Sequence, residues 1–98
     1  MPFPLELEPR AVLDIQDIVD YYNLQQPGLG KKFFKSLEDS FRIIAENPYF
    51  KVRYDEVRCL PIKKFPYMIH FIVGHDFVRV YGVISTFMDP EKNYIKEN

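Results

Sequence analysis

Residues 67–84 read YMIHFIVGHDFVRVYGVI, and this stretch decides the fold. Residues 67–73 and 77–84 are apolar-rich runs, and a turn signal, Gly74-His75-Asp76, separates them. Two such runs with β-branched and aromatic side chains predict an antiparallel β-hairpin. A loop of three residues would turn Arg79 toward the apolar side chains, which is costly if they form the core. A loop of two or four residues gives a clean apolar face, so we prefer that register.

This register sorts the side chains of the hairpin between two faces of the sheet. It places His70 opposite Tyr81 and Ile72 opposite Arg79. The first face is apolar and consists of Tyr67, Ile69, Phe71, Val73, Val78, Val80 and Ile84. The second face collects Met68, His70, Ile72, Arg79, Tyr81 and Val83. We therefore expect the first face to pack on the core and the second face to be open.

The second face carries the candidate chemistry of the chain. An arginine there could stabilise the charge that develops on a phosphodiester, while His70 or Tyr81 moves protons. Arg58, Lys63 and Lys64 could lie near the rim of this face. The alternative is that these side chains are ordinary polar neighbours on a solvated surface. Spacing alone leaves both interpretations open.

Two amphipathic helices are predicted before the hairpin. Pro9 suits the first turn of the first helix. The apolar stripe of that helix consists of Ala11, Ile15, Ile18 and Tyr22, and its polar side of Asp14, Gln16, Asp17 and Asp20. The second helix is expected from about Leu29 to Glu46, and Asn47-Pro48 ends it, because the residue before proline avoids the helical region. The short break at Pro27-Gly28 predicts an antiparallel helical hairpin.

Three shorter strands complete the predicted fold. Residues 3–8 alternate apolar and acidic side chains, and Pro4 either confines this first strand to an edge of the sheet or is itself confined to the first residues of the strand. Residues 50–54 and 57–62 are the other two candidates. The order of one strand, two helices and then a run of strands predicts an α+β fold, with the helix pair on one face of an antiparallel sheet.

Composition limits the classes of function. The 98 residues predict a single domain, 1–98, and a net charge of −1 means that any nucleic-acid site must be local. One cysteine, Cys59, excludes an internal disulfide and fits a cytoplasmic protein. Neither a signal peptide nor a membrane span is expected. The spacing of histidine and cysteine predicts no metal site, and we expect no cofactor.

Six motifs together resemble the RelE/ParE toxin superfamily, and the ParE-like branch fits best. The resemblance runs from about Leu5 to Pro90. The motifs are DIVDYY at 17–22, PGLGKKF at 27–33, IAENP at 44–48, Arg58-x-Leu60, FPYMI at 65–69 and Asp89-Pro90. Their order and spacing imply a helical hairpin packed on a curved antiparallel sheet.

The resemblance implies the toxin half of a bacterial type II toxin–antitoxin module (a plasmid stabilisation system), with a cognate antitoxin as partner. Members similar to RelE cut messenger RNA on the ribosome without a metal, whereas members similar to ParE poison DNA gyrase. For the ribonuclease, the candidate catalytic residues are Arg58, which matches a recurrent family arginine, Arg79 and Tyr81 on the last strand, and His70. A lone chain could also form a homodimer.

One departure from the family pattern separates these activities. Many members carry His-x-x-Arg before the Asp-Pro step, and here Ser85 replaces the histidine and Met88 the arginine. A serine hydroxyl does not take up and release a proton near neutral pH as imidazole does. A methionine thioether cannot pair with a phosphate group as an arginine does. We therefore favour a ParE-like toxin that binds a target such as gyrase. A ribosome-dependent endoribonuclease and an attenuated interaction module are the alternatives.

Overall fold

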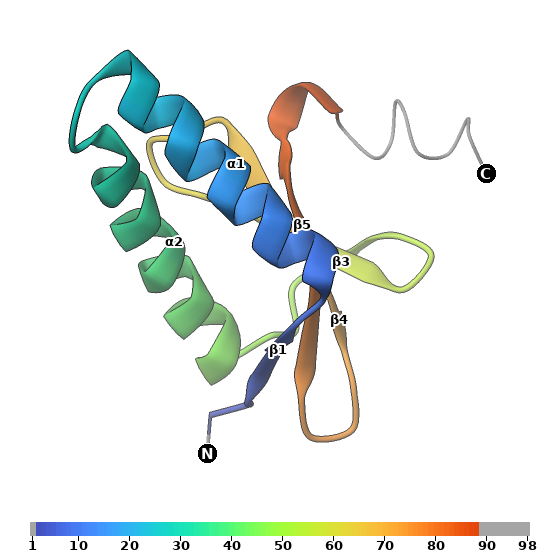
Figure 1. Ribbon diagram of the computed structural model, residues 1–98. Coiled ribbons are helices and arrows are strands. Elements are labelled where there is room, and N and C mark those ends of the chain that lie inside the picture. Colours follow the sequence, from blue (N-terminus) through green and yellow to red (C-terminus); the bar gives the residue numbers. More distant parts are fainter. Residues whose placement is uncertain (1, 89–98) are drawn as a thin grey trace.

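The computed structural model describes residues 2–88, which fold as two helices packed on a five-stranded mixed sheet (Figure 1). The elements are β1 Leu5–Leu7, α1 Pro9–Gln25, α2 Leu29–Glu46, β2 Val52–Tyr54, β3 Val57–Pro61, β4 Tyr67–Val73, β5 Val78–Ser85 and a 3-10 turn, Thr86–Met88. This arrangement confirms the predicted α+β class. The Asp89-Pro90 motif lies outside the described residues.

The strand order in the sheet is β1-β5-β4-β3-β2, so β1 forms one edge, which is one of the two positions that Pro4 allowed. The expected all-antiparallel sheet is wrong in one respect, because β1 pairs in parallel with β5, Leu5 opposite Val78. Antiparallel neighbours are commonly joined by a tight turn, whereas β1 leads directly into α1 and no turn fixes its direction. The carbonyl of Pro4 accepts a hydrogen bond from the Val78 amide at 2.9 Å, which extends the pairing by one residue.

The helical hairpin agrees with the prediction, including both ends of α2. Gly28 precedes α2 with φ of 89°, a left-handed conformation that glycine adopts without steric cost. Gly30 allows the helices to approach closely, since a Cβ atom there would lie 2.6 Å from the Val19 carbonyl oxygen. The Asn23 side chain accepts a hydrogen bond from the Gly30 amide at 3.0 Å, which ties the end of α1 to the start of α2. Neither helix within residues 2–88 combines the length and apolar character needed to cross a bilayer.

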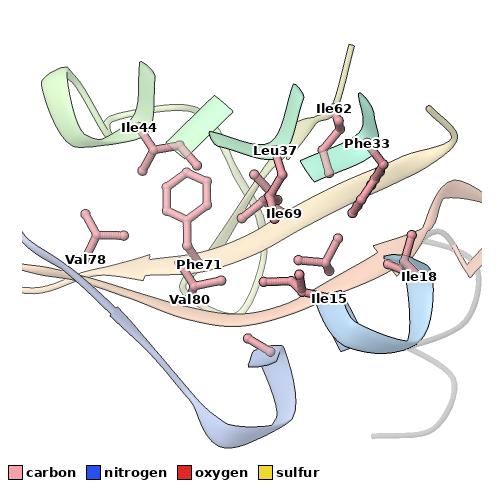
Figure 2. Packing of buried hydrophobic residues seen from close by; sticks show 12 residues of the cluster. Ile15, Ile18, Phe33, Leu37, Ile44, Ile62, Ile69, Phe71, Val78 and Val80 are labelled. Atoms are coloured by element: carbon pink, nitrogen blue, oxygen red, sulfur yellow. The ribbon is translucent and has the colours of Figure 1, made fainter. Parts of the chain in front are cut away.

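The core lies between the helical hairpin and one face of the sheet. Figure 2 shows the Phe71 ring directed from β4 toward Ile44 of α2, with Val78 and Val80 beside it. Phe71, Ile44, Val78 and Val80 are all fully buried. Burying a side chain of this size contributes about 1.5–3 kcal/mol relative to leaving it exposed. The larger of the two apolar clusters lies on this face.

The β4–β5 hairpin has a four-residue loop, one of the two even lengths predicted, because Val73 pairs with Val78, but it contains a β-bulge. Ile72 pairs with Arg79 as expected. Phe71 pairs with Val80 and His70 pairs with Gly82, which leaves Tyr81 as an extra residue. The predicted pairing of His70 with Tyr81 is therefore wrong.

The bulge also exchanges the faces of the two residues that follow it. Val83 belongs to the core cluster, and Ile84 lines a hollow on the opposite face together with His70. The prediction had placed these two residues the other way round. A bulge shifts the strand by one residue, and with a side-chain period of two, the faces of all later residues change.

Candidate functional site

The open face is the side of the sheet turned away from the helices. It carries a small apolar cluster of Val57, Cys59 and Met68, with Tyr54 and Ile72 packed against it. These side chains come from β2, β3 and β4. The cluster gives the open face a short dry floor, and polar groups lie around it.

His70 is the central polar group of this face, and its side chain is completely buried. Its Nδ1 atom lies 3.0 Å from the Tyr54 hydroxyl and 3.6 Å from the Cys59 sulfur. In the tautomer protonated at Nε2, Nδ1 accepts a hydrogen bond from the tyrosine hydroxyl. These contacts fix the orientation of the imidazole ring against the strand.

A hollow of about 300 Å³ lies beside His70, between β5 and the start of α1. Tyr81 and Ile84 line it from β5, and Tyr54 from β2. The first residues of α1 close the other side with Glu8, Pro9 and Arg10. His70 and Tyr81 therefore share one hollow although they are not paired in the ladder. We call this space the His70 hollow.

A second hollow, of about 430 Å³, adjoins the first along the open face, and Tyr54 and Tyr81 line both. Its rim includes Asp55 and Glu56 in the β2–β3 turn. Asp55 has φ of 49°, a left-handed conformation that aspartate tolerates better than most residues. The two carboxylates make this part of the open face unfavourable for a phosphate group.

Arg58, the arginine that matches the family pattern, lies on the helix-covered side of the sheet. It pairs with Phe71, whose side chain is in the core, so both point to the same side. The Arg58 Nε donates a hydrogen bond to the Phe50 carbonyl at 2.6 Å, and its guanidinium lies 5.8 Å from the centre of the Tyr49 ring. The expectation that Arg58 borders the open face is wrong, because it holds the segment that leaves α2 instead.

Arg79 lies on the open face, but its charge is directed to the edge of the sheet. Its guanidinium donates a hydrogen bond to the Glu6 carboxylate of β1 at 2.9 Å, and it lies 5.5 Å from the centre of the Phe77 ring. The hydrogen bond to Glu6 is the main cause that raises the pKa of Arg79 above its usual value. Its cation is therefore engaged with β1, and Arg79 does not line the His70 hollow.

Asp14, which the helical pattern assigned only to the polar side of α1, contacts β5 beside the bulge. Its carboxylate accepts a hydrogen bond from the Val83 amide at 3.1 Å, directly after the bulge. Burial is the largest cause that raises the pKa of Asp14, while the bond from Val83 and the charge of Arg10 act in the opposite direction. A Cβ atom at Gly82 would lie 2.9 Å from this carboxylate. A glycine inside a strand is the sequence signal for such a close approach.

The remaining predicted positions are outside the hollow. Lys63 and Lys64 lie in the turn between β3 and β4, and Lys64 lines a hollow with α2, away from the open face. Ser85 pairs with Tyr67 at the end of β5, and its hydroxyl accepts a hydrogen bond from the Phe87 amide at 3.2 Å. Of the four candidate catalytic residues, His70 and Tyr81 line one hollow, and Arg58 lies on the other side of the sheet. Arg79 lies on the open face near enough to Tyr81 for their charges to interact, but it is outside the hollow.

Comparisons with known proteins agree with this architecture. A family model described as the ParE toxin of the type II toxin–antitoxin system parDE matches residues 5–90. A chain in the solved structure of the chromosomal ParDE TA system from P. aeruginosa is similar with a TM-score of 0.77 and 16% sequence identity. The similar region covers 85% of this chain and 95% of that chain, which shows the same fold. No curated protein sequence matches the chain.

Proposed function

Since the chain belongs to the ParE toxin family of type II toxin–antitoxin systems, we propose that it acts by binding a protein target such as DNA gyrase, and that a cognate antitoxin neutralises it. The encounter with both partners takes place in the cytoplasm, where gyrase acts. The toxic step in this proposal is the formation of a complex and needs no cleavage of RNA.

One observation carries the choice of binding over cleavage: the candidate catalytic residues do not converge. Cleaving RNA without a metal requires a cation beside the developing charge on phosphate and a proton-transfer group within hydrogen-bond reach. Arg58 lies on the other side of the sheet, and Arg79 is bonded to Glu6 at 2.9 Å. Neither predicted arginine lines the hollow that His70 and Tyr81 share.

The charge around the open face supports the same choice. Asp55 and Glu56 lie on the rim of the hollow next to His70. Affinity for nucleic acid comes largely from several cations that neutralise phosphates, and the chain as a whole carries a net charge of −1. Carboxylates on the rim would repel an RNA backbone approaching Tyr81.

An exposed stripe on α1, in which apolar side chains alternate with Asp17 and Asp20, supports the proposed antitoxin contact. Leu13, Tyr21 and Leu24 follow a helical spacing, and they are 64%, 52% and 87% exposed. Exposed apolar residues that share one helix face are typical of protein-binding surfaces. We propose that the antitoxin covers this stripe, as amphipathic segments cover apolar surfaces in other complexes.

A ribosome-dependent ribonuclease is the second candidate, and the His70 hollow favours it. The exposed Tyr81 side chain and the buried His70 line this hollow together with Arg10. Arg10 could supply the cation that Arg58 and Arg79 do not. The conflict with Asp55 and Glu56 places this candidate second.

The test is to induce the chain alone in a bacterial host and to follow growth, plasmid supercoiling and messenger RNA cleavage in the same cells. Growth arrest with altered supercoiling and intact messages is the expected result. Arrest with normal supercoiling and cleaved messages would instead favour the ribonuclease, and Tyr81→Phe would then abolish the arrest. Absence of arrest, with folded protein recovered from the cells, would contradict both toxins and leave an interaction module.

A further inference from the structure

Five lysines gather at the end of the molecule where α2 begins, and we call this group the lysine patch. Its members are Lys31, Lys32 and Lys35 in α2 and Lys63 and Lys64 in the turn between β3 and β4, all exposed. They are five of the 13 basic residues of a chain that carries a net charge of −1. Figure 1 shows the β3–β4 turn, drawn in yellow, beside the helical hairpin at this end.

Three of the five lysines border a hollow of about 330 Å³ between α2 and the turn. Lys32 and Lys35 line it from α2, and Lys64 and Phe65 line it from the turn. The Phe65 ring packs edge-on against Phe33 with centroids 5.3 Å apart, which holds the turn against the helix. The hollow therefore has an apolar side and a cationic rim on a fixed backbone.

The turn keeps a lysine where the backbone favours a glycine. Lys64 has φ of 74°, in the left-handed region that non-glycine residues rarely occupy. Residues held in such conformations cluster at binding sites, because the surrounding structure must enforce them. This conformation fixes the position at which the Lys64 side chain leaves the turn.

The charges of the patch are not neutralised within the part of the chain that the structure describes, residues 2–88. None of the five lysines there forms an ion pair with a carboxylate. Asp39 borders the hollow, but its carboxylate pairs with Arg42 at 2.9 Å. Cations crowded in this way repel one another, and an anionic partner would relieve the repulsion.

We propose that the lysine patch docks an acidic peptide segment of a partner protein, with one apolar side chain of that segment in the hollow. The cationic rim matches carboxylates, and the Phe65 side of the hollow matches an apolar anchor. A nucleic acid fits less well. Asp39 stands on the rim, so a continuous phosphate backbone would meet this acid.

This surface is separate from the open face, and the inference does not depend on which target the toxin has. The His70 hollow is lined by residues of β2, β4, β5 and the start of α1, whereas the lysine patch belongs to α2 and the β3–β4 turn. An acidic segment could therefore bind while the open face stays accessible.

The experiment measures binding of three fluorescent probes to the full chain by anisotropy at low and high salt. The probes are a short peptide of alternating glutamate and leucine, the same peptide with glutamine for glutamate, and a single-stranded oligonucleotide of equal charge. Lys35→Glu tests the patch, and Lys51→Glu is the matched control, because Lys51 is also exposed but precedes β2 beyond the other end of α2. Far-UV circular dichroism checks that both variants are folded.

The expected result is binding of the acidic peptide that weakens with salt, falls about tenfold in Lys35→Glu and stays unchanged in Lys51→Glu. Equal binding of the glutamine peptide would overturn the proposal in favour of a purely apolar site. Tighter binding of the oligonucleotide would assign the patch to nucleic acid. If the chain self-associates with increasing concentration and Lys35→Glu abolishes this, the partner of the lysine patch would be the acidic side of α1 in a second copy. If none of the probes binds, the proposal is also rejected.

Discussion

The two faces of the same sheet bury their residues by different means. On the helix-covered face, Phe71 is fully buried beneath α2 and surrounded by apolar side chains. On the open face, the neighbouring His70 is equally buried, but it is covered by side chains such as Tyr54 and contacts polar atoms. Adjacent residues of one strand thus serve different purposes. One face carries the larger apolar cluster, and the other holds a polar ring beside an accessible hollow.

The largest expected effect on stability comes from creating a cavity in the core of the helix-covered face. Phe71→Ala removes a fully buried aromatic ring at the centre of the core and leaves a cavity, which should lower the free energy of unfolding by about 3–5 kcal/mol. Urea denaturation followed by circular dichroism measures this change. Ile72→Ala, at the next position on the half-buried open face, is the matched control. A loss in Ile72→Ala as large as in Phe71→Ala would break the comparison between the faces.

A smaller effect is expected from the polar contact of the open face. Tyr54→Phe removes the hydroxyl that lies 3.0 Å from the His70 Nδ1 but keeps the ring against the apolar cluster. The free energy of unfolding should fall by about 1 kcal/mol, since a buried acceptor loses a hydrogen bond. Denaturation measures the loss, and the imidazole signals of His70 in the NMR spectrum should shift. An unchanged spectrum would show that the hydroxyl does not hold the ring.

The smallest effect is expected at Asp14, where α1 meets β5 at the bulge. Because burial raises its pKa, the folded chain holds this proton more tightly than the unfolded chain does. The resulting stabilisation is complete below the ordinary aspartate pKa of 3.8, and it is lost as pH rises through the folded-state pKa. Asp14→Asn stays neutral, so it should gain stability relative to the parent as pH rises through that window.

Denaturation of the parent and of Asp14→Asn across this pH range measures the difference between their free energies of unfolding. The contributions of the other carboxylates cancel in this difference. The charged groups that act on the Asp14 carboxylate are Arg10 and Asp17. A difference that does not vary with pH, or that favours the parent increasingly as pH rises, would contradict the assigned cause.

Local signals in the sequence predicted most of the fold. Gly28 and Pro48 punctuate the chain on either side of α2, and both ends of that helix were predicted correctly. The even loop of the hairpin followed from the apolar pattern alone, because an odd loop would have turned Arg79 toward the core. The direction of β1 was not predictable in this way, since no turn links it to β5.

The candidate site was harder to predict because it depends on pairings between distant segments. The face of Arg58 is set by the register of β3 against β4, and Arg58 pairs with Phe71. The bond from Val83 to Asp14 joins residues 69 positions apart. Gly82 was the one local signal for the bulge. The alternating apolar pattern around it also fits a regular strand, so the bulge was not predicted.

The bulge has a genetic consequence. β5 contains one residue more than β4 can pair, because Val80 and Gly82 face consecutive residues of that strand, Phe71 and His70. An in-frame deletion of the Tyr81 codon would leave every other pair of the ladder with its present neighbour. A lineage could therefore lose or regain the aromatic group at the His70 hollow in one mutational event, while the buried side of the sheet stays as it is.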